Sequence, residues 1–376
     1  MYKRHKIFWN IVVPIVRVFL RFKFGYTYKK AEGLPDKYIV LSNHTTDYDP
    51  LFVASSFDKQ MYFVASEHVA RWGYLSKFLN YWVSPIVRYK GTTATITVME
   101  MLRKIREGAS VCMFAEGARS WDGVTDMFLP STGKVVKSAK CALVTYRIEG
   151  GYFASPRWST SNTRRGRVYG APVNIYTQEQ LAKMTPAEIN EVIARDLRED
   201  AYARQAEAPT KYKGKNLAEN MENLLFICPK CGGYDTFQSK GNTVSCKACD
   251  LEFRYTEYGM LEGAPFDTVY EFAKWQREEA RKAIAENVTF SAPSGTLKTV
   301  ENHVENLVDE GAVTMTTEAI TVGNTSISME DVMDLNMHGR RGLVFSTKDA
   351  YYELLPEKGV CAYKFHLMYD LYKGIR

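Results

Sequence analysis

The stretch YIVLSNHTTDYDP, residues 38–50, places an imidazole and a carboxylate directly after a buried strand. Its first four residues are apolar and are typical of a strand inside a sheet. His44 follows at the strand end, and Asp49 comes five residues later in a turn. Imidazole titrates near neutrality and accepts a proton from an alcohol, and a carboxylate on its other nitrogen fixes the tautomer. We therefore interpret His44 as a general base held by Asp49, and the nearer Asp47 as part of the turn.

Two further apolar runs end in charged residues. Residues 84–88, SPIVR, deliver Arg88 at a strand end, and residues 111–115, VCMFA, run into the sequence EGARS at 116–120. The glycine permits a tight turn, and the arginine fork beside it suits bidentate capture of a phosphate. Each signal alone has a structural alternative: a histidine that only packs, or a surface Glu–Arg pair in a turn.

Taken together, the three stretches resemble the glycerolipid acyltransferase family, of the 1-acyl-sn-glycerol-3-phosphate acyltransferase type. The family's N-H-x4-D block matches residues 43–49, its arginine-ended strand matches 86–88, and its E-G-T-R-S block matches 116–120. A fourth block, an apolar strand usually with prolines, falls at 143–148, which lack them. Separated motifs that match jointly, in order, are far rarer than one motif alone.

The resemblance implies a direct transfer of a fatty acyl group from acyl-CoA or acyl-carrier protein to a lipid hydroxyl. His44 is then the general base, and Asp49 orients the ring and balances the imidazolium that forms. The hydroxyl attacks the thioester without an acyl-enzyme. The expected acceptor is lysophosphatidate or a related alcohol.

The resemblance also implies a substrate-binding set. Arg88 and Arg119 hold the phosphate of the acceptor, and Glu116 positions Arg119 or an acceptor hydroxyl. Asn43 shapes the turn or the oxyanion site. The remaining members of the set are Gly117 and Ser120.

Two departures from the family pattern concern the acceptor. Ala118 stands where the family usually has threonine, and residues 147–167 add a basic and aromatic segment. The added segment is expected to reshape the acceptor pocket, and both departures leave a lipid acceptor other than lysophosphatidate open.

The pattern along the chain predicts an α/β fold with a mixed, acyltransferase-type sheet flanked by helices, because short apolar runs alternate with helical stretches. A four-cysteine zinc ribbon and a small β barrel or sandwich capped by a helix are expected to follow. With 376 residues, 45% of them hydrophobic, the chain has ample material for several cores. The expected divisions are a membrane-associating amphipathic helix at 1–30, the acyltransferase domain at 31–176, a helical connector at 177–225, the ribbon at 226–258, a helical linker at 259–286 and a PH-like β domain at 287–376.

The N-terminal segment mixes apolar, aromatic and basic residues. Residues 7–24 contain three cations, so no charge-free run approaches the roughly 18 residues that cross a bilayer. No cleavage-site pattern follows. We expect a helix that lies on a membrane surface, with the protein cytoplasmic and peripherally attached to the inner face. The alternative is a helix packed on the next domain with its basic residues simply solvated.

Four of the seven cysteines form two C-x2-C knuckles, separated by 14 residues. Four thiolates at that spacing close a tetrahedral site, for which structural zinc is the expectation and rubredoxin-like iron the alternative. The net charge of +6 is mild for the length, so the ribbon predicts an interaction module and no nucleic-acid partner. Free thiols elsewhere suit a reducing compartment. The four ligands are Cys228, Cys231, Cys246 and Cys249.

Residues 287–376 show short β runs with turn signals and one closing helix at about 364–372. The pattern resembles a PH-like domain in topology, with phosphoinositide or protein binding as one outcome and a plain packing or dimerisation module as the other. Three functional hypotheses follow for the whole chain. The first is the acyltransferase above, the second is a membrane-bound adaptor with a non-catalytic domain, and the third is an acyltransferase with a different lipid acceptor.

Overall fold

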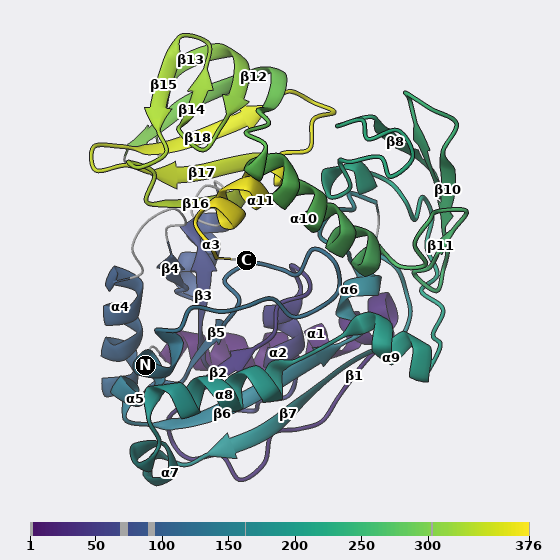
Figure 1. Ribbon diagram of the computed structural model, residues 1–376. Coiled ribbons are helices and arrows are strands. Elements are labelled where there is room, and N and C mark those ends of the chain that lie inside the picture. The colour runs from purple at the N-terminus through teal and green to yellow at the C-terminus, as the bar shows by residue number, and fades with distance from the viewer. Residues whose placement is uncertain (1–2, 68–73, 89–94, 162, 302–303, 376) are drawn as a thin grey trace. The chain divides into compact units, whose positions relative to one another are not determined.

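The computed structural model describes residues 3–67, 74–88, 95–161, 163–301 and 304–375 (Figure 1). The described residues divide into two compact units. The first contains those of 1–88, 94–157 and 162–214, and the second contains 158–161 and 215–376. The expected connector at 177–225 is therefore divided between the two units. Its residues up to Gly214 belong to the first unit, and the rest belong to the second.

The first unit is built on a seven-stranded sheet in the order β1-β7-β6-β2-β5-β3-β4. β2 lies parallel to both β5 and β6, whereas β7 runs antiparallel to β6, so the sheet is mixed as expected. The α/β class is thus confirmed. The strands are β1 (Tyr26–Tyr28), β2 (Tyr38–Ser42), β3 (Tyr62–Ser66), β4 (Ile86–Arg88), β5 (Val111–Phe114), β6 (Ala142–Glu149) and β7 (Val168–Tyr176).

Helices cover both faces of this sheet, which explains why every residue of β2 is buried. Side chains alternate along a strand, so Ile39 and Leu41 pack on one face with Ile189 of α8. On the other face Tyr38 stacks on Phe57. The helices are α1 (Lys3–Phe24), α2 (Asp49–Ser55), α3 (Tyr74–Trp82), α4 (Thr95–Arg106), α5 (Thr132–Ala139), α6 (Gly151–Ala154), α7 (Gln178–Lys183), α8 (Pro186–Leu197) and α9 (Ala201–Glu207).

The expected N-terminal helix ends earlier than residue 30. Gly25 follows α1 with φ +70°, and a Cβ there would lie 2.1 Å from the carbonyl oxygen of Gly166. Only glycine fits this turn, after which β1 joins the sheet beside β7. None of the helices in the described part of the chain is both long enough and apolar enough to span a bilayer.

The second unit begins with the cysteine segment, a small sheet in the order β11-β10-β9-β8. Its strands are short, and the last of them lies beyond the expected boundary at 258. They are β8 (Phe237–Lys240), β9 (Thr243–Cys246), β10 (Glu252–Tyr255) and β11 (Leu261–Glu262), after a short 3-10 turn at Met221–Asn223.

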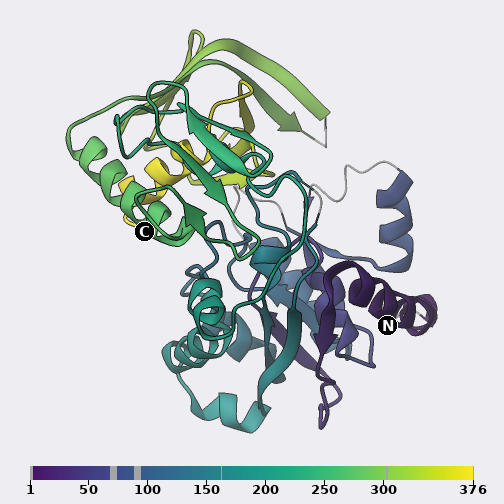
Figure 2. The same cartoon turned by 90° about the vertical axis from the view of Figure 1, so that its right-hand side faces the viewer.

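The rest of the second unit is an antiparallel half-barrel of seven strands in the order β15-β14-β13-β12-β18-β17-β16. Figure 2 shows its long light-green strands from the side. This confirms the expected small barrel with a closing helix, while its PH-like character stays a prediction. Helix α10 (Val269–Ala285) precedes the barrel and α11 (Tyr363–Tyr372) closes it. The strands are β12 (Phe290–Glu301), β13 (Val304–Met315), β14 (Ala319–Val322), β15 (Thr325–Ser328), β16 (Asp334–His338), β17 (Gly342–Ser346) and β18 (Tyr351–Pro356).

Candidate active site

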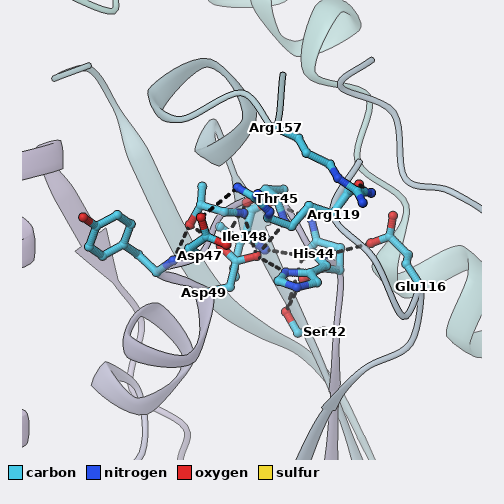
Figure 3. A network of polar contacts seen from close by, with 12 residues as sticks. Ser42, His44, Thr45, Asp47, Asp49, Glu116, Arg119, Ile148 and Arg157 are labelled. Carbon is cyan, nitrogen blue, oxygen red and sulfur yellow. Dashed lines mark hydrogen bonds and ion pairs between the residues drawn. The ribbon is translucent and has the colours of Figure 1, made fainter. Parts of the chain in front are cut away.

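The loop after β2 brings His44 and Asp49 together. His44 Nδ1 lies 2.8 Å from Asp49 Oδ2, and the two side chains are 20% and 0% exposed (Figure 3). Asp49 is the first residue of α2, so the short turn between strand and helix sets the separation. With Nδ1 bonded to the carboxylate, Nε2 is the nitrogen through which His44 exchanges a proton with a substrate.

The Asp49 carboxylate is held by two threonines that the motif leaves unspecified. The backbone N–H groups of Thr45 and Thr46 donate to Oδ2, at 2.5 and 2.9 Å. Their hydroxyl groups donate to Oδ1, at 3.1 and 2.8 Å. Four donors besides the imidazole therefore satisfy this buried charge, which keeps its position independent of the histidine ring.

The surroundings of His44 favour its neutral form. Burial lowers the pKa of His44 below its ordinary value of 6.5, and the hydrogen bond and charge of Asp49 oppose that change. The ring stacks on Phe114 of β5, with ring centroids 4.4 Å apart and planes at 20°. A neutral, clamped imidazole next to a carboxylate is the arrangement that general-base catalysis requires.

Glu116 fixes the backbone that carries His44. Its Oε1 accepts the N–H of His44 at 2.6 Å, and its Oε2 accepts the N–H of Asp126 at 2.7 Å. Burial raises the pKa of Glu116 well above the usual glutamate value, while these N–H groups favour the charged form. This backbone-positioning role differs from the expected orientation of Arg119 or of an acceptor hydroxyl.

Three other members of the expected substrate-binding set also shape the loops. Asn43 exchanges two hydrogen bonds with the backbone of Ile148 in β6, at 2.9 and 2.8 Å. Gly117 has φ +68° and forms a turn whose N–H donates to the carbonyl oxygen of Phe114. Ser120 donates its N–H to the carbonyl oxygen of His44 at 3.0 Å, and its hydroxyl donates to that of Val124. The two motif loops are thereby joined into one body.

Arg119 lies in the same site. Its Nη1 forms an ion pair with Asp47 Oδ2 at 3.1 Å, so Asp47 takes part in more than the turn. The carbonyl oxygen of Arg119 accepts a hydrogen bond from Arg157 Nη1 at 2.8 Å, and the Arg157 guanidinium stacks over Trp121 at 4.3 Å. The site thus combines a histidine–carboxylate pair with two buried guanidinium groups.

Comparison with known proteins fits this geometry. Residues 26–149, which contain the His44 loop and the 116–120 loop, match the family model described as Acyltransferase. Residues 26–149 form an acyltransferase domain.

Other comparisons add less. The chain is similar to the crystal structure of the 1-acyl-sn-glycerophosphate acyltransferase PlsC from Thermotoga maritima, with 18% identity and a TM-score of 0.42. The similarity covers 55% of this chain and 84% of that one. No curated protein matches the sequence. The assignment of the acyltransferase domain therefore rests on the family match.

Arg88 occupies a different part of the acyltransferase domain from Arg119. It ends β4, where it pairs in register with Ser66 of β3. β4 stands three strands from β2, which corresponds to about 14 Å at the usual strand spacing. Arg88 and His44 thus share the carboxyl edge of the sheet without being neighbours along it.

Among the basic residues of the segment at 147–167, Arg157 contacts Arg119 of the described site. Arg147 pairs instead with Glu149, with Nε 3.3 Å from Oε1. Arg165 donates to the carbonyl oxygen of Phe22 at the end of α1. Those two arginines support the domain's framework.

Several residues of the site could not be inferred from the motifs. Thr45 and Thr46 carry a weak signal, since hydroxyl residues between a histidine and an aspartate commonly hydrogen-bond in turns. Phe114 is the last residue of a strand predicted to end at the site. The position of Arg157 relative to Arg119 has no signal in the sequence, because it depends on how a distant loop folds back.

The four cysteines of the second unit converge as expected. Their sulfur atoms all lie within 4.8 Å of one another. Cys228 Sγ and Cys249 Sγ are 3.7 Å apart, and Cys231 Sγ and Cys246 Sγ are 3.8 Å apart. A metal at about 2.3 Å from each of four tetrahedral sulfurs requires edges of about 3.8 Å, so these residues are positioned to bind a metal ion.

Proposed function

We propose that the protein is an O-acyltransferase that moves a fatty acyl group from acyl-CoA or acyl-carrier protein to the free hydroxyl of lysophosphatidate or a related lipid alcohol. The observation that carries the proposal is the part-buried His44–Asp49 pair beside Arg119, inside a domain that matches the Acyltransferase family. General base and cation are the two elements that transfer to a phosphorylated alcohol requires.

In the proposed reaction, Nε2 of neutral His44 removes the proton of the acceptor hydroxyl while the oxygen attacks the thioester carbonyl carbon. Asp49 stabilises the imidazolium that forms. The tetrahedral intermediate collapses, the carbon–sulfur bond breaks, and the imidazolium returns its proton to the departing thiolate. The products are an ester and a free thiol, and His44 is again neutral.

The acceptor's phosphate is assigned to Arg119, with Arg88 as a second cation farther along the sheet edge. Arg119 is close to His44 because Ser120 N–H donates to the carbonyl oxygen of His44. Its planar guanidinium binds two phosphate oxygens at once. The experiment below determines whether the donor is acyl-CoA or acyl-carrier protein and which acyl-chain length is transferred.

Product analysis tests this function. Purified protein is incubated with a labelled acyl-CoA or acyl-carrier protein and with lysophosphatidate or phosphate-free lipid alcohols, and lipids are identified by mass spectrometry. We expect phosphatidate as the main product. Transfer to another lipid alcohol would correct the assignment of the acceptor and leave the proposed acyl transfer unchanged. The absence of an acylated product with every donor and acceptor would instead support the adaptor hypothesis.

The rate is expected to depend on pH through His44. Only the neutral imidazole accepts a proton, so activity falls as pH drops through the His44 pKa. Since burial lowers that pKa below 6.5, the acid limb of kcat/KM should have its midpoint below pH 6.5. A pH–rate profile from pH 4.5 to 8 measures it. A midpoint above 6.5 would contradict a His44 base that burial keeps neutral.

We further propose that the first unit docks on a membrane surface, which is where the lipid substrates lie. α1 presents an outward apolar row at helical spacing, and Phe8 of α1 packs on Phe78 of α3, which adds exposed aromatic rings. Exposed Lys3, Lys6 and Arg21 provide cations for anionic lipid. The outward residues of the row are Ile7, Ile11, Ile15, Val18 and Phe22.

Replacing Ile15 with aspartate is expected to weaken vesicle binding about tenfold or more. The variant loses an isoleucine side chain that docking would bury in the bilayer, and it gains a charge that opposes insertion. The measurement is co-sedimentation with vesicles of phosphatidylglycerol and phosphatidylcholine. Leu307→Asp is the matched control, because Leu307 is 64% exposed and Ile15 is 63% exposed. Equal binding of the two variants would contradict docking through α1.

For the four-cysteine cluster we propose structural zinc. All four ligands come from protein side chains, which leaves no open coordination position for substrate, so the ion would stabilise the ribbon without taking part in acyl transfer. The ribbon and the half-barrel are assigned to interaction with partners or to regulation.

A further inference from the structure

The Asp47–Arg119 ion pair joins two side chains with very different exposure. The side chain of Arg119 is 9% exposed, whereas that of Asp47 is 66% exposed (Figure 3). Asp47 belongs to the same loop as His44 and Asp49 but lies between them in sequence, outside the two motif positions. A buried cation is thus covered from the solvent side by a carboxylate that water reaches easily.

The two partners also differ in how firmly they are held. The Arg119 backbone is fixed by Arg157, which is 3% exposed, and by the adjacent hydrogen bond from Ser120 to His44. Trp121, also 3% exposed, supports the Arg157 guanidinium. The backbone of Arg119 is therefore held in place, and a rotation of the exposed Asp47 side chain is sufficient to open the ion pair.

A phosphate competes well for this position. The Asp47 carboxylate presents an oxygen 3.1 Å from Arg119 Nη1, which is longer than the about 2.7–2.9 Å of a charge-assisted hydrogen bond. A phosphate monoester carries more negative charge and three acceptor oxygens, so it binds a guanidinium more strongly than an exposed carboxylate does. A neutral alcohol has no group that replaces the carboxylate.

We propose that Asp47 is a displaceable counterion of Arg119, and that the acceptor's phosphate takes its place when the acceptor binds. This inference rests on the proposed acyl transfer to a phosphorylated lipid. It makes Asp47 a specificity-determining residue, because a phosphorylated acceptor opens the pair and an acceptor without phosphate leaves it closed. Competition by Asp47 raises the apparent KM of phosphorylated acceptors.

The test is Asp47→Asn, measured in two ways. Binding of sn-glycerol 3-phosphate, followed by calorimetry, needs no turnover, and steady-state kinetics compare lysophosphatidate with monoacylglycerol. The Asp47 carboxylate is 66% exposed, so water and salt weaken its ion pair with Arg119. We therefore expect the variant to lower the Kd of glycerol 3-phosphate and the KM of lysophosphatidate about two- to fivefold. The KM of monoacylglycerol is expected to stay within error of the wild-type value.

Asp36→Asn is the matched control, since Asp36 is fully exposed and pairs with Lys59 at 3.3 Å. It removes the same charge from the surface and should leave the Kd of glycerol 3-phosphate unchanged. Asp47→Ser is a second variant in case the amide forms a new hydrogen bond.

Two results would overturn the proposal. One is a Kd of glycerol 3-phosphate that Asp47→Asn and Asp47→Ser leave unchanged or raise, including no binding by any of the proteins. The other is transfer to phosphate-free acceptors only, which would make Asp47 a permanent partner of Arg119. A wild-type protein that binds glycerol 3-phosphate more weakly than Asp47→Asn, yet forms no acylated lipid, would refute the proposed function and leave the counterion role standing.

Discussion

Replacing His44 with alanine is expected to lower kcat/KM for acyl transfer about 10³- to 10⁴-fold, because general-base assistance commonly contributes up to that amount. The folded state should be retained. Asp49 keeps the four hydrogen bonds from Thr45 and Thr46 after the ring is removed, so no buried charge is left unpaired. Steady-state kinetics measure the loss of kcat/KM, and a thermal melt of the same preparation shows whether the folded state is retained.

A second histidine–carboxylate pair in the chain supplies the control. His338 Nδ1 lies 2.9 Å from Glu353 Oε1, and both side chains are 16% exposed, in the half-barrel of the second unit. His338→Ala removes a pair of similar geometry from the second unit, and its kcat/KM should stay near the wild-type value. Activity of His44→Ala within tenfold of wild type would refute the base assignment.

The parts of this site that lie within one motif were predictable, because the residue types and the spacing of the motif specify them. A histidine after a buried strand and an aspartate five residues later determined the pair, and the structure brings those atoms to 2.8 Å. The strand β5 and the glycine turn at 116–117 were predictable for the same reason. In each case the signal lies within about ten residues, where spacing and turn chemistry decide the geometry.

Contacts between distant segments were not predictable. Asp47 and Arg119 are 72 positions apart, and they meet because β2 and β5 are neighbours in the sheet. The position of Glu116 against the His44 N–H follows from the same pairing. An ion pair has no periodicity and no fixed spacing, so only the strand order identifies its partners.

The C-terminal strands show a second reason why prediction from the sequence fails. The sequence predicts only short β runs within 287–376, but β13 extends over the 12 residues Val304–Met315. Most of its N-terminal half is exposed on both faces, so the alternation of apolar and polar residues that predicts a strand is missing there. Pairing with β12 creates that strand, and pairing is a tertiary property.

Loss of the metal is expected to have the largest effect on the second unit. The ribbon sheet has strands of four, four, four and two residues, too short for independent stability. Zinc binding to four thiolates contributes about 10–16 kcal/mol of apparent free energy in small zinc domains. The double variant Cys231→Ser/Cys246→Ser should therefore lose the ion and become protease-sensitive within 226–258. Limited proteolysis with mass mapping measures the protease sensitivity, and elemental analysis measures the loss of the ion.

Metal content separates the alternatives at this site. We expect about one zinc per chain in the purified protein, without visible absorption, whereas a rubredoxin-like iron centre would be coloured. Cys141→Ala is the control, because Cys141 is buried in the first unit and should not alter the metal content. Two sulfur–sulfur distances, 3.7 and 3.8 Å, already match the edges of a tetrahedral site. A chelator that removes the ion should therefore expose four reactive thiols together. A folded ribbon that resists protease equally well with and without metal would show that the apolar contacts around Phe237 and Phe253 hold it instead.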